Sequence, residues 1–95
     1  MVYEIVVQHV DPANRDAHIA AWREAWKTAG FAGSHGVKFL RSVEDPGGVI
    51  VQIEWDSVEA HQKHRGTPVH NAFREASGKL QTAPSEISHY TIEEI

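Results

Sequence analysis

The sequence contains no cysteine. This absence excludes disulfide bonds, thiolate catalysis and iron–sulfur clusters, and a structural zinc site is not expected. Basic residues are few: nine Lys and Arg compare with thirteen Asp and Glu, and no basic run reaches three residues. A nucleic-acid partner requires a concentrated basic stripe, so we expect none. A role at an acidic membrane surface is disfavoured for the same reason.

Long hydrophobic stretches are also missing. Apolar runs extend over only a few residues, whereas a membrane span needs about 20. The segment Met1 to Val7 alternates like a strand and lacks the features of a signal peptide, so we expect a cytoplasmic protein. No phosphate-binding Gly-rich loop, serine elbow, or flavin or nicotinamide fingerprint is found, since Gly47-Gly48 falls in a predicted hairpin. We therefore expect no cofactor.

The length and the apolar pattern predict one domain over residues 1–95. Alternating apolar residues indicate strands, and 3-4-3 spacing indicates amphipathic helices. The predicted elements are a strand at 3–10, a helix at 13–29 begun by Asp11-Pro12, strands at 35–44 and 49–55, a helix from the cap Asp56 to Arg65 that restarts at Thr67-Pro68 and continues to Gly78, and a strand at 87–92.

This order is the split βαβ pattern of the ferredoxin-like α+β fold, an antiparallel four-stranded sheet with two helices on one face. Both faces of the first three strands carry large apolar side chains, yet the helices cover only one face. Monomers rarely leave such a patch exposed. We therefore expect a homodimer that packs through the sheet face.

Histidine is unusually frequent, with seven copies in 95 residues, and three of them fall in the second helical region. His61 and His64 are three apart on one helical face, and His64 follows the inward-facing Ala60 by four. His70 follows Thr67-Pro68, where the helix dipole lowers the pKa of an imidazole. A neutral imidazole beside an apolar cavity suits a general base for a phenol. The alternative is that these are half-exposed helix residues without a chemical role.

The His61-x-x-His64 pair also raises the question of a metal. Two imidazoles need a third ligand, and His9, Glu54 and His70 are the candidates. The further ligands that make zinc signatures convincing are missing. We expect no metal.

Trp22 and Trp26 are four apart on the first helix. Core packing and lining a cavity for a flat aromatic ligand are compatible interpretations of this pair. Trp55 ends the third strand and is predicted to anchor the junction to the next helix. His9 is in phase with the apolar residues of the first strand, so it either points into a cavity on that face or reaches water at the strand end.

We expect structural roles or surface positions for the remaining polar residues. Glu4 and Glu54 are predicted to pair with Arg41 or Lys38 across strands. Arg41 and His89, if buried, need polar partners. His18 and His35 are predicted to lie at the surface or in turns.

The third strand and the region after it carry a resemblance to a known family. It rests on Val49-Ile50-Val51-Gln52-Ile53-Glu54-Trp55, then Ser57-x-Glu59-Ala60-His61-x-x-His64, then Thr67-Pro68-x-His70-x-x-Phe73. With these motifs, residues 2–93 resemble the antibiotic biosynthesis monooxygenase-like family of dimeric α+β barrel proteins. The resemblance implies a ferredoxin-like subunit, a homodimer and a pocket between helices and sheet.

The resemblance also implies an activity. Family members oxidise a small phenol, quinol or anthrone with molecular oxygen and without metal or flavin: a base removes a phenolic proton, and the electron-rich anion reduces oxygen itself. His64 matches a histidine often present in these sequences and is the first candidate for the base; His70 is the second. The predicted substrate-binding residues are Trp22, Trp26, His61, Trp55, Phe73 and His9.

Some proteins of this fold degrade haem with a strand-one asparagine, a helix-two tryptophan and a later histidine ligand. Here Gln8 or His9, His64 and Arg74 are near those positions, which argues against haem degradation. Two other functions stay open. One is a ligand-binding or stress-related dimer without turnover. The other is a cyclase or isomerase that uses the same histidine on a polyketide-like substrate.

Overall fold

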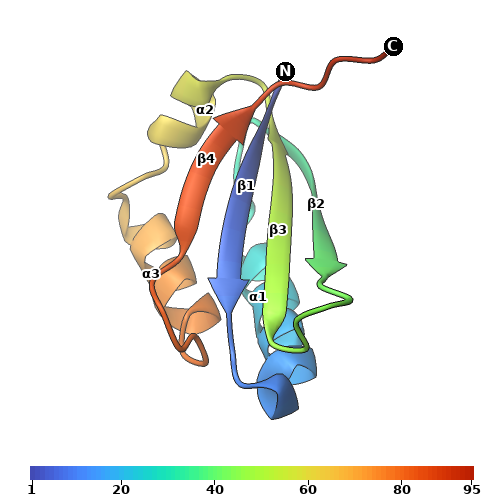
Figure 1. Ribbon diagram of the computed structural model, residues 1–95. Coiled ribbons are helices and arrows are strands. Elements are labelled where there is room, and N and C mark those ends of the chain that lie inside the picture. Colours follow the sequence, from blue (N-terminus) through green and yellow to red (C-terminus); the bar gives the residue numbers. More distant parts are fainter.

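The computed structural model describes all 95 residues and contains four strands and a set of helices (Figure 1). The elements in chain order are β1 (Val2–His9), the short 3-10 helix η1 (Pro12–Asn14), α1 (Arg15–Ala29), β2 (Ser34–Arg41), β3 (Gly48–Trp55), α2 (Val58–Gln62), α3 (Pro68–Ser77) and β4 (Glu86–Tyr90).

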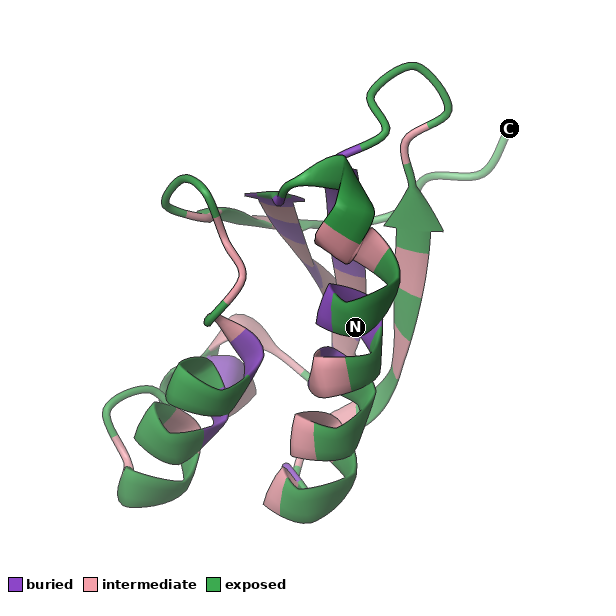
Figure 2. Ribbon diagram, turned by 90° about the horizontal axis from the view of Figure 1, so that it is seen from below, coloured by how far each residue is buried: buried purple, intermediate pink, exposed green.

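The four strands form one sheet in the order β2-β3-β1-β4, and all neighbouring pairs are antiparallel. The helices lie together on one side of this sheet (Figure 1). Figure 2 shows that the buried residues occupy the sides of helices and strands that face each other. This arrangement confirms the predicted ferredoxin-like α+β fold. None of the helices is both long and apolar enough to span a membrane.

Two helix starts differ from the prediction. The side chain of Asp11 accepts a hydrogen bond from the Ala13 amide, but it caps the 3-10 turn, and α1 begins only at Arg15. The α2 helix is capped by Ser57, whose Oγ accepts a bond of 3.1 Å from the Ala60 amide. Asp56 was the predicted cap, but its carboxylate instead contacts His35. The α2 helix is only five residues long, because it ends at Gln62 and not at Arg65 as predicted.

The break between α2 and α3 lies where the sequence predicts it. Gly66 has a positive φ of 81°, which a residue with a side chain rarely adopts. Thr67 then caps α3 by accepting a hydrogen bond of 3.2 Å from the His70 amide, and Pro68 begins the helix. This break turns the chain, so α2 and α3 cover different parts of the sheet (Figure 1).

The hydrophobic core lies between α1, α3 and the sheet. Strand β3 contributes every second residue from Val49 to Trp55. Helix α1 contributes Ile19 and Trp22, and the Trp22 ring meets Phe73 of α3 edge to face with centroids 4.8 Å apart. These contacts join both helices to the sheet and form the apolar side of the site.

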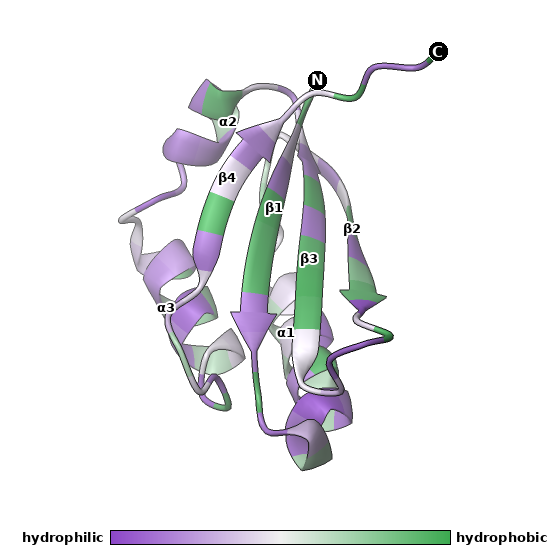
Figure 3. Cartoon of the chain, in the orientation of Figure 1, coloured by the Kyte–Doolittle hydropathy of each residue, from purple (hydrophilic) through white to green (hydrophobic).

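The other face of the sheet has no covering element in this chain (Figure 1). Apolar side chains on this face include Tyr3, Ile5, Val7, Leu40 and Ile50, since their strand neighbours are the buried residues. Figure 3 shows the hydrophobic residues along β1 and β3. The predicted second copy of the chain on this face stays a prediction.

Candidate functional site

A cavity of about 650 Å³ opens between β1, β4 and the α2–α3 region. Its floor is the helix-facing side of β1, and the segment 78–85 that leads from α3 to β4 forms one wall. It is lined by Glu4, Val6, Gln8, Trp22, His61, Arg65, His70, Asn71, Phe73, Arg74, Glu75, Ser77, Gly78, Lys79, Gln81, Ala83, Pro84, Ser85 and Ile87. Aromatic, acidic and basic groups therefore meet in one space.

Glu4 is the most unusual residue of this lining because its carboxyl group is buried, with only 5% of the residue exposed. Its Oε1 accepts a hydrogen bond of 3.0 Å from the indole Nε1–H of Trp55. Nε2 of His61 lies 3.4 Å from the same oxygen. Burial raises the pKa of Glu4, while the Trp55 hydrogen bond and the charge of Arg65 act to lower it.

His61 connects Glu4 to the edge strand β4. Its ring stacks on Trp55 with centroids 4.9 Å apart, and its Nδ1 lies 2.7 Å from Nε2 of His89. A carboxylate beside Nε2 favours the tautomer with the hydrogen on that nitrogen. Nδ1 of His61 then accepts the hydrogen bond that Nε2–H of His89 donates. Burial, and next the neighbouring His89, lower the pKa of His61 to about 4.

A second polar network surrounds Gln8, two residues beyond Val6 on the same face. Oε1 of Gln8 accepts hydrogen bonds from Nε1 of Trp22 at 3.0 Å and from Nε2 of His18 at 2.7 Å. Nε2 of Gln8 donates to Oγ of Ser85 at 3.1 Å. The indole can only donate, so the amide orientation of Gln8 is fixed. This network ties the 78–85 segment to the core.

His18 was predicted to lie at the surface, and this prediction is wrong. The residue is 0% exposed, because α1 places it one turn before Trp22, on the same side of the helix. Burial lowers its pKa. It acts as a hydrogen-bond partner of Gln8 rather than as a solvent-facing group. His35 is exposed, as predicted.

His70 lines the cavity, and its two ring nitrogens have different surroundings. Nδ1 is fully buried and has no hydrogen-bond partner, whereas Nε2 is not fully buried. Burial, and next the charge of Arg74, lower the pKa of His70. The protonated ring would carry two N–H donors, one of them without an acceptor, so the neutral form is favoured.

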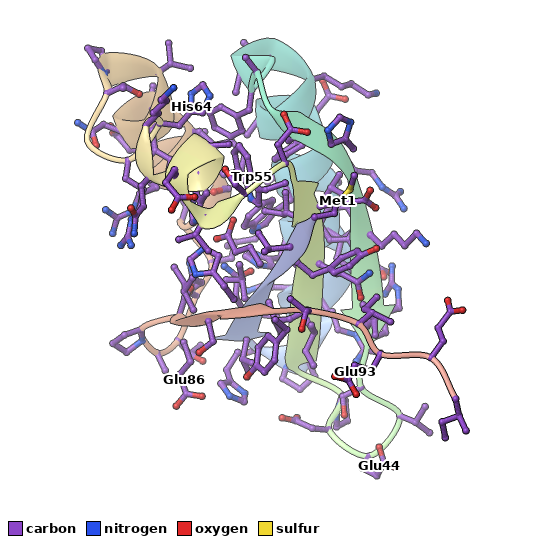
Figure 4. All side chains as sticks on the ribbon, turned by 90° about the horizontal axis from the view of Figure 1, so that it is seen from above. Met1, Glu44, Trp55, His64, Glu86 and Glu93 are labelled. Atoms are coloured by element: carbon purple, nitrogen blue, oxygen red, sulfur yellow. The ribbon has the colours of Figure 1, made fainter.

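His64, the first candidate for the base, is not part of the cavity lining. Its Nε2 donates a hydrogen bond of 2.7 Å to the carbonyl of Ala32. Its ring lies 5.8 Å from that of Trp55, at the end of the molecule where α2 lies (Figure 4). The α2 helix ends at Gln62, so the helical spacing that predicts an inward His64 does not extend to it.

The predicted aromatic residues are only partly brought together at the cavity. Trp22 and Phe73 line it. Trp55 is buried behind Glu4 and His61, and Trp26 packs edge to face against Phe31 and Phe73. The cavity therefore lies between β1, β4 and the α2–α3 region, and α1 contributes only Trp22.

His9 lies on the uncovered face of the sheet, with its Nδ1 3.5 Å from a carboxylate oxygen of Asp45. It is exposed, as expected for a strand-end residue that reaches water, and it is not in the lining of the cavity. The pairing predicted for Glu4 is also wrong. Arg41 instead binds Asp16 of α1, and Lys38 is on the uncovered face.

The sequence carried signals for residues that were not assigned to the site. Glu4 and Gln8 lie on the covered side of β1 together with Val6. Two polar residues in phase with a buried apolar residue are a sequence signal for buried polar groups that need partners. Their partners come from distant segments and could not be identified. No group of three or more His, Asp or Glu side chains is arranged to hold a metal ion.

Comparisons with solved structures agree with this fold. A provisionally named antibiotic biosynthesis monooxygenase of Bordetella bronchiseptica is 25% identical, with a TM-score of 0.80 over 98% of this chain and 97% of that one. Rv0793 of Mycobacterium tuberculosis is 21% identical, with a TM-score of 0.74 over 99% and 96%. A conserved protein of Methanosarcina mazei is 13% identical, with a TM-score of 0.77 over 97% and 92%.

No curated protein matches the sequence. A family model described as antibiotic biosynthesis monooxygenase matches residues 1–76, which is most of the chain. The chain belongs to the antibiotic biosynthesis monooxygenase family.

Proposed function

We propose that this protein is a cofactor-independent monooxygenase that oxidises a small aromatic phenol, quinol or anthrone-type substrate with molecular oxygen. Membership of the family supports the reaction class. The observation that carries the proposal is the cavity itself, in which the aromatic side chains of Trp22 and Phe73 are combined with the proton acceptors Glu4 and His70. A flat hydroxylated ring fits such a lining, because it has both an apolar face and an acidic hydrogen.

His70 is the better of the two histidine candidates for the base. Its lowered pKa keeps the imidazole neutral at pH 7, and in the tautomer with the hydrogen on the buried Nδ1, Nε2 can take a proton. His64 has its Nε2 engaged with the Ala32 carbonyl and is outside the lining. We therefore assign the base to His70 and expect His64 to support the packing around Trp55.

The reaction balances without a further reductant. His70 removes the hydroxyl proton, and the resulting anion gives one electron to O2. The substrate radical and superoxide then combine, which forms a carbon–oxygen bond. The peroxide anion takes the proton back from His70, and the hydroperoxide then loses water as its O–O bond breaks and a C=O bond forms. In an anthrone, a CH2 group and O2 thus become a carbonyl and H2O. In a phenol or quinol, the hydrogens of the O–H and of the attacked ring C–H leave as water, and a quinone forms. The protein supplies the base, the orientation and a site with little water.

We also propose that the working form is a homodimer through the uncovered sheet face. Large apolar residues on that face, such as Ile5, Val7 and Ile50, have no cover in the chain. Two-fold pairing of the same patch is the usual way to bury such a surface.

Oxygen uptake with a panel of dihydroxynaphthalenes and anthrones tests the proposed activity. We expect uptake with at least one of them, and a loss of about 100-fold or more in His70→Gln, since a general base contributes on this scale. His35→Gln is the matched control, because His35 is exposed and is not part of the cavity lining. His64→Gln should retain most of the activity.

Three outcomes would contradict parts of this proposal. Tight aromatic binding without uptake would favour a ligand-binding dimer. A product with a new ring or a shifted double bond and no oxygen consumption would favour a cyclase or isomerase. Uptake that survives the double change His64→Ala and His70→Ala would refute a histidine base.

A further inference from the structure

Glu4 has one carboxylate oxygen that the protein does not satisfy. Oε1 is engaged by Trp55 and lies beside His61. Oε2 has no hydrogen-bond partner in the protein. It is not fully buried, and Glu4 lines the cavity. Because this acceptor oxygen is open to the cavity, it is available to a hydrogen-bond donor that enters there. The open oxygen therefore points to a donor that enters the cavity.

A comparison within the same strand separates the two roles of this side chain. Gln8 holds the indole of Trp22 at 3.0 Å with a neutral amide, and its other end is satisfied by Ser85. Glu4 holds the indole of Trp55 at the same distance of 3.0 Å. An amide is thus sufficient to anchor an indole on β1. The second carboxylate oxygen at position 4 is not needed for anchoring.

We propose that Oε2 of Glu4 is a ligand-binding atom that accepts a hydrogen bond from a hydroxyl group on an aromatic ligand. Trp55 and His61 fix the carboxyl plane through Oε1, and Trp22 and Phe73 provide apolar contact for the ring on the same cavity. The inference uses the proposed function only for the aromatic nature of the ligand. It does not depend on turnover.

The substitution Glu4→Gln isolates the open oxygen. The glutamine carbonyl can still accept the hydrogen bond from Trp55, as Gln8 does for Trp22. The atom that faces the cavity becomes an NH2 donor instead of an acceptor. Glu54→Gln is the matched control, because Glu54 is on the uncovered face of β3. Urea unfolding of both variants verifies that each is folded before binding is measured.

Calorimetric titration without oxygen provides the test, with 1,3-dihydroxynaphthalene and 1,3-dimethoxynaphthalene as probes. The methyl ether keeps the ring but cannot donate a hydrogen bond. We expect the wild-type protein and Glu54→Gln to bind the dihydroxy probe at least about tenfold more tightly than the ether, the scale of one hydrogen bond. Glu4→Gln should lose this preference while still binding the ether.

If Glu4→Gln still binds the dihydroxy probe more tightly than the ether, Oε2 of Glu4 is not the ligand-binding atom. A wild-type protein that binds both probes equally or binds neither would also overturn the assignment. Failure of the proposed function gives a different result: the hydroxyl preference would be present and abolished by Glu4→Gln, but oxygen uptake would be absent.

Discussion

Nε1 of Trp55 donates a hydrogen bond of 3.0 Å to Oε1 of Glu4. The register of the sheet makes this contact, because Trp55 on β3 is opposite Val2, so Glu4 is its diagonal neighbour on the covered face of β1. The bond fixes one oxygen of a buried carboxyl group and leaves the other facing the cavity. A hydrogen bond between two neighbouring strands thus orients the carboxyl group of Glu4 in the site.

Replacing Trp55 by phenylalanine should test this contact. Trp55→Phe keeps an aromatic ring but removes the donor, so the pKa of Glu4 should rise further. We expect a loss of about 2–4 kcal/mol in the free energy of unfolding, from the bond and from the smaller ring. Urea unfolding measures it. Trp26→Phe is the control, since Trp26 is half-buried and makes no side-chain hydrogen bond. Equal losses in both variants would contradict a specific role for the bond.

Gln8 should be important for stability because it satisfies two buried donors at once. Gln8→Met preserves the side-chain volume but leaves Nε1 of Trp22 and Nε2 of His18 without their acceptor. The expected cost is about 2–5 kcal/mol, since each buried group loses its partner. On the uncovered face, Gln52→Met should change the stability by about 0.5 kcal/mol or less. Chemical denaturation measures the free energy of unfolding of both variants. A Gln8→Met variant as stable as the wild type would argue against the stabilising role of this network.

Acid should destabilise the protein through His61. The folded protein protonates this ring only near its lowered pKa of about 4, whereas the unfolded chain does so near 6.5. Between these values the unfolded state binds more protons, so the free energy of unfolding falls as the pH falls from 6.5 to 4. The full effect of His61 is roughly 3 kcal/mol.

The raised pKa of Glu4 acts with the opposite sign, so the contribution of His61 has to be isolated. His61→Gln leaves the other titrating groups in place. The pH dependence of the stability between 6.5 and 4 should be shallower in this variant than in the wild type. Gln62→Ala, an exposed change beside His61 that removes no titrating group, should retain the wild-type slope. An unchanged slope in His61→Gln would show that His61 is not held neutral.

The uncovered sheet face should control the oligomeric state. Ile5 lies on that face of β1, between its partners Gln52 on β3 and Ser88 on β4. Ile5→Lys places a charge in the proposed interface and should convert a dimer into a monomer in sedimentation velocity. Ala76→Lys, on the exposed side of α3, should remain dimeric. A monomeric wild-type protein would reject the interface.

Much of the fold could be predicted from local patterns. Strict alternation from Val49 to Trp55 identified β3 and its buried face, and Thr67-Pro68 identified the start of α3. These features depend on periods of two and 3.6 residues and on caps, all of which are local in the sequence. The start of α2 was displaced by one residue because Ser57 and Asp56 are both capable caps, and the competing contact of Asp56 with His35 is not local.

The site was less predictable because its contacts join distant segments. Alternation places Glu4 on the covered face but does not identify Trp55, on another strand, as its partner. The burial of His18 could have been inferred from its position four residues before Trp22. The position of His64 depended on the length of α2, and the early end of that helix removed it from the cavity.

Isotope labelling tests whether the cavity oxidises an aromatic substrate with O2 and the base His70. The dialysed protein, with a chelator present, is supplied with 18O2 and the best substrate of the uptake panel, and the product is analysed by mass spectrometry. We expect one atom of 18O in the product, with formation slowed by about 100-fold in His70→Gln and unchanged in His35→Gln. A product whose new oxygen comes only from water, or one formed equally fast by His70→Gln, would contradict the proposed reaction.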